Sequence, residues 1–274
     1  MAKLTIKQLQ TLANQIRQDI IEMTYRAGSG HPGGSLGMAD IFTVLYFYIL
    51  NHIPEQPDYP YRDRLILSNG HIAPVLYSSL ARSGYFPLVK LKSLRKINSQ
   101  LQGHPHYGSL AGIETSSGPL GQGISQAVGM ALAAKMGKLK YQIYCVTSDG
   151  EHNEGQLWEA VMSANKYRLD NLITIIDNNG IQIDGYTKNI MPLGSLKKKY
   201  QAFGWQVIEI NGHNIKQIIT ALKKAKQAKG PVAIVAHTTL GKGVKFMENK
   251  YEWHGKAPKE DEAQKALKEL KNAI

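Results

Sequence analysis

From residue 124 to residue 237 the sequence alternates between strand-like and helix-like segments. Short apolar runs are separated by longer segments whose apolar residues recur at helical spacing. Because strands joined through helices pair in parallel, this alternation predicts an α/β fold, with a mostly parallel sheet and helices on both faces. The expected strands span residues 142–147, 172–177, 206–210 and 231–237, and the expected helices span residues 124–136, 154–167, 196–203 and 214–228.

The N-terminal half is less regular. A capping-box pattern, Thr5 with Gln8, predicts a helix that ends near Gly28, and a second such pattern, Asn214 with Gln217, opens the last helix named above. A loop as long as residues 98–123, rich in Gly, His, Ser and Pro, is usually functional in a compact protein. The other expected elements are helices at residues 38–50, 73–82 and 88–97 and a strand at residues 64–68.

Composition narrows the class of protein. The chain has 274 residues, of which 43% are hydrophobic, and no Pro- or Ser-rich linker, so we expect one domain over residues 1–274 that ends in a basic helix. The net charge of +12 comes largely from lysine runs. No nucleic-acid-binding motif accompanies these runs, and we interpret them as solvated surface.

The single cysteine and the lengths of the apolar runs indicate the cellular compartment of the protein. The lone Cys145 lies in an apolar run, as expected of a core thiol in a reducing environment. The N-terminus lacks the apolar region of a signal peptide, and the apolar run at residues 41–50 is too short to cross a bilayer. The sequence therefore predicts a cytoplasmic protein that binds neither a membrane nor nucleic acid.

Polar residues follow two neighbouring expected strands. Asp149 comes just after one strand and Asn179 just after the next, so both are expected at the same edge of the sheet. Carboxylate and amide oxygens suit Mg²⁺ or Ca²⁺, and Gly150 permits close approach of a diphosphate. The alternative is that Asp149 and Asn179 only form turns, because such residues are common in turns.

The segment that begins Ser148-Asp-Gly-Glu, with Asn178-Asn179 about thirty residues further on, resembles the thiamine diphosphate-binding motif. Ser148 stands where the usual motif has glycine. Further segments, in the same order along the chain, make the whole sequence similar to the transketolase family. These segments are Ser29-Gly-His-Pro-Gly33, Leu67-Ser-Asn-Gly-His71, Gly103-His104-Pro105, Gly118-Pro-Leu-Gly-Gln-Gly123, Thr238-Thr-Leu-Gly-Lys-Gly243 and His254-Gly-Lys-Ala-Pro258.

The resemblance implies the thiamine diphosphate-binding fold and a role for each matched residue. Histidines titrate near neutral pH, which suits the proton transfers of ketol chemistry. The implied metal ligands are Asp149, Asn179 and the carbonyl of Ile181; the implied cofactor contacts are His71, Gly118, Pro119, Leu120, Gly150, Asn179 and His254; the implied catalytic residues are His31, His71, His104 and His254; and the implied subunit-coupling residues are Glu154 and Glu159. The role of His152 stays open, and His52, His106, His213 and His237 are interpreted as structural.

The resemblance also implies a reaction and a partner. We expect the N-terminal subunit of a split transketolase, which transfers a two-carbon ketol unit from a ketose phosphate to an aldose phosphate. In this family a pyrimidine-binding domain completes the site, so a C-terminal subunit is the expected partner, in a self-dimer or an α2β2 heterotetramer. Two alternatives stay open: a related carboligase subunit that uses a keto acid, and a non-catalytic basic regulatory subunit.

Overall fold

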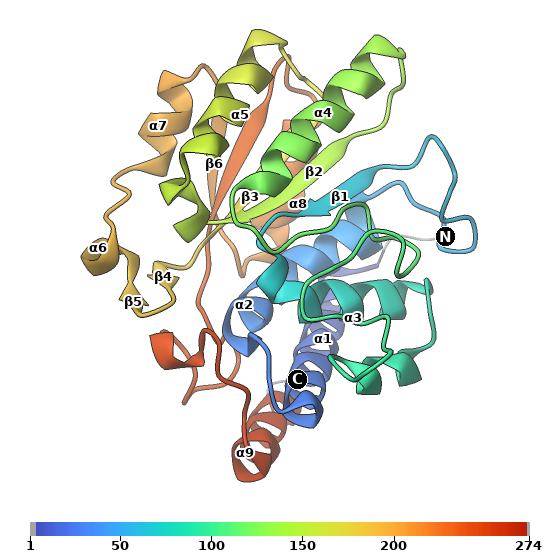
Figure 1. Ribbon diagram of the computed structural model, residues 1–274, viewed down its shortest axis with the longest axis vertical. Coiled ribbons are helices and arrows are strands. Elements are labelled where there is room, and N and C mark those ends of the chain that lie inside the picture. Colours follow the sequence, from blue (N-terminus) through green and yellow to red (C-terminus); the bar gives the residue numbers. More distant parts are fainter. Residues whose placement is uncertain (1–3, 273–274) are drawn as a thin grey trace.

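The computed structural model describes residues 4–272. At its centre is a five-stranded sheet in the order β1-β2-β3-β7-β6, in which every neighbouring pair is parallel (Figure 1). The predicted α/β class and the five predicted strands are confirmed, and β1 and β6 form the two edges. The strands are β1 (Arg64–Leu67), β2 (Ile143–Ser148), β3 (Leu172–Asn178), β6 (Gln206–Asn211) and β7 (Val232–His237).

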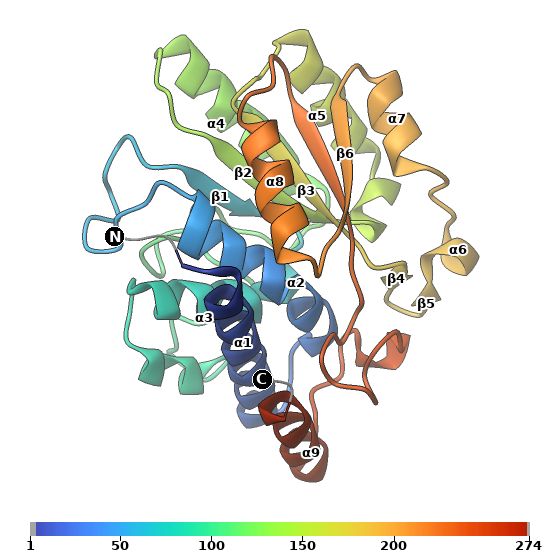
Figure 2. The ribbon, with the colours of Figure 1, turned by 180° about the vertical axis from the view of Figure 1, so that it is seen from behind.

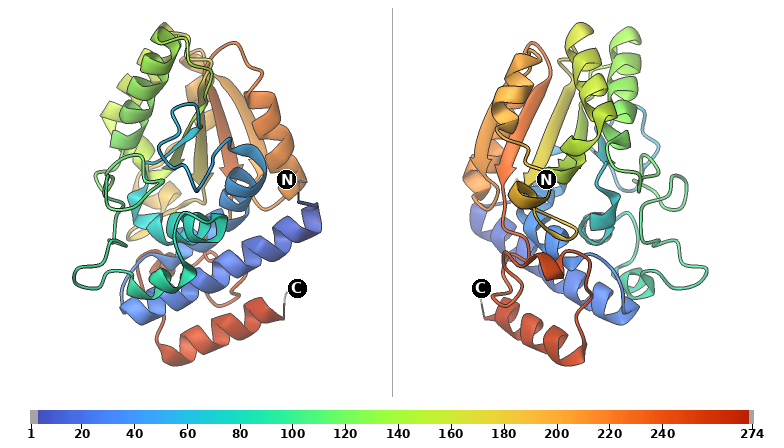
Figure 3. Two further views of the ribbon diagram at one scale, coloured as in Figure 1. Left: turned by 90° about the vertical axis from the view of Figure 1, so that its right-hand side faces the viewer. Right: turned by 60° about the vertical axis from the view of Figure 1, so that its left-hand side comes forward.

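Helices cover both faces of the sheet, as predicted (Figures 2 and 3). Alternate residues of β2 pack into two different cores: Tyr144 and Val146 join the core under α1, α2, α3 and α8, whereas Ile143 and Cys145 join the core under α4, α5 and α7. This alternation follows from the two-residue period of a strand. The α-helices of the described chain are α1 (Ile6–Ala27), α2 (Pro32–Val44), α3 (Ala73–Ser83), α4 (Gln122–Met136), α5 (Gly155–Lys166), α6 (Thr187–Ile190), α7 (Leu196–Ala202), α8 (Ile215–Ala225) and α9 (Glu260–Lys271).

Local capping explains where α1 begins and ends. The Thr5 hydroxyl accepts a hydrogen bond from the Gln8 amide, and the Gln8 side chain accepts one from the Thr5 amide, so the predicted capping box is confirmed. The helix ends at Gly28, whose φ is +62°. At α8 only half of the predicted box forms. Asn214 caps the Gln217 amide, but the Gln217 side chain bonds the Asn211 amide instead.

The second helix begins six residues earlier than predicted. Tertiary packing there outweighs the low helix propensity of its glycines. The predicted helix at 38–50 is α2, which starts at Pro32 and continues as a π-helical segment, η1 (Leu45–Ile49). Proline is well tolerated in the first turn of a helix. A Cβ on Gly33 would lie 2.7 Å from the carbonyl oxygen of Trp253, so glycine permits close packing here.

The predicted helix at 88–97 is wrong, because the chain forms only a 3₁₀ segment, η3 (Leu88–Ser93). Leu91 and Leu94 are buried three residues apart, and a 3₁₀ turn places such residues on the same side. The segment ends at Ser93, and two residues later Arg95 adopts a left-handed conformation with a φ of +57°.

Several short elements have no counterpart among the predictions. They include an antiparallel hairpin, β4 (Ile181–Gln182) with β5 (Gly185–Tyr186), and the 3₁₀ segments η2 (Gly70–Ile72), η4 (Gly150–Asn153) and η5 (Tyr251–Trp253). The C-terminal helix, α9, is acidic in its first turn and basic in its last, so its charge is mixed rather than uniformly basic. No helix within residues 4–272 is both long enough and apolar enough to cross a bilayer.

Candidate functional site

A cavity of about 470 Å³ lies beyond the carboxyl ends of β1, β2 and β3. Loops at this edge of a parallel sheet are the usual place for ligands. The cavity wall brings together ten of the thirteen residues singled out from the sequence: His31, His71, His104, Gly118, Leu120, Gly150, Glu154, Asn179, Ile181 and His254. Pro119, Asp149 and Glu159 do not line it.

Three of the four histidines form a compact cluster, although they come from separate segments. His31 precedes α2, His71 lies in η2, and His254 follows η5. Their ring centroids are 5.2 Å apart for His31 and His71, 5.7 Å for His31 and His254, and 5.1 Å for His71 and His254. His104 completes the cavity wall from the long loop at residues 98–123, which contains no helix or strand before α4 begins.

All four imidazoles are held in the neutral form. Burial, followed by the neighbouring His254, Arg95 and His104, lowers the pKa of His31 to about 4. Burial and the nearby imidazoles lower the pKa of His71 well below its usual value, and burial lowers that of His254. The pKa of His104 falls through burial and the charge of Arg95. At neutral pH each ring can therefore both donate and accept a hydrogen bond.

Two of these rings carry an unused polar atom. The Nδ1 atoms of His31 and His254 are buried and have no hydrogen-bond partner among the described residues. Buried polar atoms in proteins are nearly always bonded. These two atoms therefore suit a polar ligand bound in the cavity.

Asp149 is buried just behind the cavity wall and joins the ends of β2 and β3. Its Oδ1 accepts a hydrogen bond from the Gly150 amide at 2.8 Å, and its Oδ2 accepts one from the Gly180 amide at 2.6 Å. Burial and the neighbouring Asp177 carboxylate raise the pKa of Asp149 to about 7, and burial raises that of Asp177 to about 6. Within residues 4–272, neither carboxylate has an ion-pair partner.

Asn179 is fixed beside these carboxylates. Its side-chain nitrogen donates to Asp177 at 3.0 Å, and its side-chain oxygen accepts from the Ile181 amide at 2.8 Å. Among residues 4–272, no group of three or more His, Cys, Asp or Glu side chains is arranged to hold a metal ion. The donors here are a carboxylate, an amide oxygen and a main-chain carbonyl, which fit a hard cation that would also offset the paired buried carboxylates.

The structure adds wall residues that sequence reasoning did not single out as site residues: Gly34, Ser148, Asn153, Gln182 and Ile183. Gln182 and Ile183 belong to the β4–β5 hairpin and its turn, whose two-residue strands are too short for a periodic signal. Of the predicted residues outside the wall, Pro119 is exposed between two lining residues, and Glu159 is exposed further along α5.

The remaining histidines mostly have local partners. His152 is buried, and its ring bonds the Ser148 carbonyl and the Tyr200 hydroxyl. His52 bonds the Tyr46 carbonyl and the Tyr85 hydroxyl. His237 is exposed beside Glu209, at 3.4 Å.

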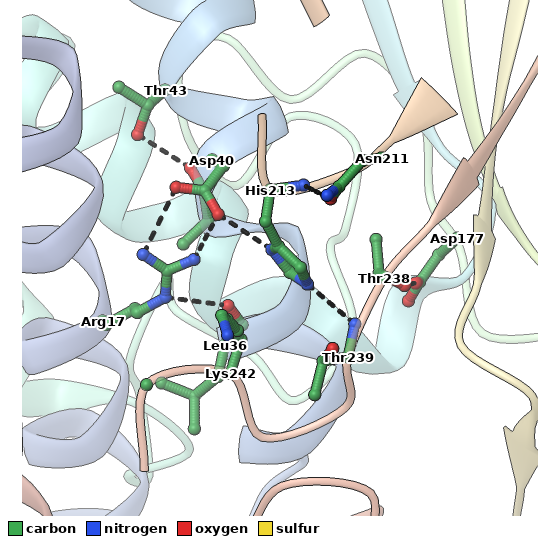
Figure 4. A network of polar contacts seen from close by, with 12 residues as sticks. Arg17, Leu36, Asp40, Thr43, Asp177, Asn211, His213, Thr238, Thr239 and Lys242 are labelled. Carbon is green, nitrogen blue, oxygen red and sulfur yellow. Dashed lines mark hydrogen bonds and ion pairs between the residues drawn. The ribbon is translucent and has the colours of Figure 1, made fainter. Parts of the chain in front are cut away.

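His213 belongs to a network of polar contacts that lies beside Asp177 (Figure 4). Its Nε2 accepts a hydrogen bond from the Thr239 amide at 2.8 Å, so its Nδ1 carries the proton and donates to Asp40 at 3.0 Å. The preceding residue, Thr238, donates its hydroxyl to Asp177. His213 thereby fixes the turn that holds Asp177 beside Asn179.

Asp40 forms a buried ion pair with Arg17 across α1 and α2, at 2.5 Å, with both side chains only 9% exposed. Although burial opposes it, this ion pair and the hydrogen bond from His213 lower the pKa of Asp40. Asp40→Ala would leave the Arg17 charge buried and unpaired.

We expect Asp40→Ala to lower the free energy of unfolding by about 3–5 kcal/mol, measured by urea denaturation. The matched control is Glu22→Ala, which breaks the exposed Glu22–Arg26 pair on the same helix, α1. This control is expected to change stability by about 0.5 kcal/mol or less. Similar losses in the free energy of unfolding for the two variants would contradict the conclusion that the buried ion pair stabilises the fold.

Comparison with known proteins identifies the kind of site. The family model described as "Transketolase, thiamine diphosphate binding domain" matches residues 8–272. Together with the cavity beyond the parallel strands, this match defines a thiamine diphosphate-binding domain. The chain belongs to the transketolase family, and the predicted resemblance and fold are confirmed.

The relatives fall into two groups: some have about the length of this chain, and others are more than twice as long. The chain is 45% identical over 263 residues to the 6-deoxy-6-sulfo-D-fructose transketolase subunit SqwG of Clostridium sp. (strain MSTE9), covering 96% of each chain. It is 41% identical over 270 residues to an apulose-4-phosphate transketolase subunit of Actinobacillus succinogenes, covering 98% of each. The solved transketolase of Campylobacter jejuni superposes with a TM-score of 0.93 at 38% identity, but this chain spans only 43% of its length.

Proposed function

We propose that this chain is the N-terminal subunit of a thiamine diphosphate-dependent transketolase, which transfers a two-carbon ketol unit from a ketose phosphate to an aldose phosphate. The observation that carries the proposal is the cavity in which four neutral histidines face the Asp149–Asn179 edge. Relatives of matching length are named as transketolase subunits, which supports activity only in complex with a second subunit.

In this proposal the sheet edge holds the diphosphate and its metal ion. Asp149, Asn179 and the carbonyl of Ile181 bind Mg²⁺ or Ca²⁺, and Gly150 lies beside the diphosphate. The buried pair Asp149 and Asp177 supports this assignment, because both carboxylates lack a cation among the described residues. When bound, thiamine diphosphate supplies the electron sink for cleavage and formation of the carbon–carbon bond. The other proposed cofactor contacts are His71, Gly118, Pro119, Leu120, Asn179 and His254.

The histidines bind the sugar and move its protons. His31, His71, His104 and His254 come from four different loops, so together they can surround the hydroxyl and carbonyl groups of one sugar. Their lowered pKa values keep the rings neutral at physiological pH, where a ring can accept a proton from one oxygen and donate to another.

The metal assignment is tested by Asp149→Asn, which removes the charge and nearly preserves the shape. We expect thiamine diphosphate to bind at least about tenfold more weakly in the presence of Mg²⁺, equal to about 1.4 kcal/mol, as measured by calorimetric titration. The matched control is Asp170→Asn, an exposed carboxylate near the opposite end of β3, with no expected effect. Unchanged affinity for thiamine diphosphate in Asp149→Asn would show that Asp149 does not bind the metal ion.

The proposed partner is a pyrimidine-binding C-terminal subunit, in an α2β2 heterotetramer. Exposed apolar side chains on α4 and α5 support a protein contact here: Met136 on α4 is 76% exposed, and Met162 on the neighbouring α5 is 51% exposed. An exposed apolar face of this kind is typical of an interaction surface. Glu154, in the cavity wall at the start of α5, and Glu159 are the proposed coupling residues. Without the partner we expect a self-dimer.

Activity assays on the assembled complex test the reaction itself. A ketose phosphate donor with an aldose phosphate acceptor should be turned over, whereas pyruvate as donor should not. A complex that turns over only the keto acid would show that the enzyme is a related carboligase and not a transketolase. A cytoplasmic location is also part of the proposal, and the buried free thiol of Cys145 is consistent with it.

A further inference from the structure

Glu151 is a fully buried carboxylate to which the proposed function gives no role. It lies in η4, two residues after Asp149. Its two oxygens accept hydrogen bonds from two distant parts of the chain and from the end of the neighbouring strand β2. Oε1 accepts from the Ser68 hydroxyl at 2.5 Å and from the Gly121 amide at 2.8 Å, and Oε2 accepts from the Ser148 amide at 2.8 Å.

Each donor belongs to a segment that supplies part of the cavity wall. Ser68 follows β1 and precedes His71 by three residues, Gly121 directly follows Leu120, and Ser148 lines the cavity itself. One carboxylate therefore bonds all three of these wall segments. Buried polar groups are costly to leave without a partner, so these hydrogen bonds keep the segments together.

The same carboxylate also caps α4. Gly121, the N-cap residue, has a φ of +76° and no side chain with which to cap the helix. Instead, Glu151 accepts from the Gly121 amide, and the Ser68 hydroxyl accepts from the Gly123 amide at 3.1 Å. Amides at the start of a helix need such acceptors.

We propose that Glu151 is a positioning residue that holds the wall segments carrying His71, Leu120 and Gly150 in one arrangement, and thereby sets the affinity for thiamine diphosphate. The inference rests on the proposed function, because it assigns the cofactor to this cavity. Glu151 does not line the cavity, so we infer that it acts on binding rather than on the chemical step.

The test is Glu151→Gln, which keeps the size of the side chain but replaces one acceptor oxygen with an amide nitrogen. Without cofactor, we expect faster hydrogen exchange in the peptides that contain residues 68–71, 118–123 and 146–150. In the complex, thiamine diphosphate should bind about tenfold more weakly, equal to about 1.4 kcal/mol. The kcat at saturating cofactor should stay within roughly threefold of wild type, as expected when only binding is lost.

Two further variants separate positioning from general destabilisation. Ser68→Ala removes the hydroxyl that bonds both Glu151 and the Gly123 amide, so it should accelerate exchange around Gly123 and, combined with Glu151→Gln, add little to the loss of affinity. Asp19→Asn weakens an ion pair with Arg82 between α1 and α3, outside the cavity wall. This control should lower stability and leave cofactor affinity unchanged.

The outcomes distinguish the inference from the function on which it rests. Equal cofactor affinity in the wild-type and Glu151→Gln complexes, or unchanged exchange in the three segments, would overturn the role of Glu151 alone. A wild-type complex that binds no thiamine diphosphate would overturn the proposed function and the affinity role of Glu151 together. A kcat that falls with unchanged affinity would make Glu151 part of the chemical step instead.

Discussion

In the assembled complex, His104→Ala is expected to slow ketol transfer by roughly 10²–10⁴-fold, the usual contribution of one general acid–base group. His104 lines the cavity from the long loop, and burial together with Arg95 lowers its pKa, so the ring is neutral at working pH. Affinity for thiamine diphosphate should change far less than the rate. Steady-state kinetics at saturating cofactor, paired with calorimetry, measure the two effects separately.

The matched control for this variant lies two residues away. His106 is exposed, outside the cavity wall, and bonded to Ser116 at 3.4 Å. His106→Ala perturbs the same loop without removing a ring from the cavity, and should leave turnover near wild type. Equal losses in the two variants would mean that the loop is needed as a whole and that His104 transfers no proton.

The purified 274-residue chain is expected to show no ketol transfer without its partner. The resemblance to full-length transketolases implies that a glutamate of the pyrimidine-binding second subunit activates the cofactor. Loss of an acid–base group alone costs roughly 10²–10⁴-fold, and loss of half the binding site adds to this. The assay combines the chain with thiamine diphosphate, Mg²⁺, a ketose phosphate and an aldose phosphate, with and without the second subunit.

Weak cofactor binding by the chain alone is compatible with this prediction, because the chain holds the diphosphate end in the proposed complex. Substantial turnover by the chain alone would refute the split-enzyme proposal. The activating carboxylate would then have to be found in this chain, and Glu154 in the cavity wall would be the first candidate to replace.

Local signals in the sequence located most of the fold. The Thr5 capping box and Gly28 set the ends of α1, because both act within one turn of the chain. The strands of the sheet were predictable from apolar runs, because both faces of the sheet are buried. The helix predicted at 88–97 was wrong, because an apolar pattern alone does not distinguish an α-helix from a 3₁₀ segment.

Much of the site was predictable only because its residues occur in motifs. His31, His71, His104 and His254 meet at one cavity although up to 223 residues separate them, and no periodicity brings them together. The role of Glu151 could not be predicted for a different reason: Glu151 stands inside a motif, but two of its three partners, Ser68 and Gly121, lie in distant segments. Contacts of this kind are set by tertiary packing, which a single sequence does not reveal.

The exposed edge of the sheet has a consequence for how the protein behaves when it is concentrated or newly made. β6 is an edge strand whose outward residues include Gln206, Glu209 and Asn211. Glu209 is paired with Lys197 at 2.8 Å, which places charge in the middle of the strand. Charged side chains on an edge strand oppose the addition of a strand from another chain, the first step of aggregation. Copies of this protein should therefore resist amyloid-like stacking through β6 even while their helical faces are still free.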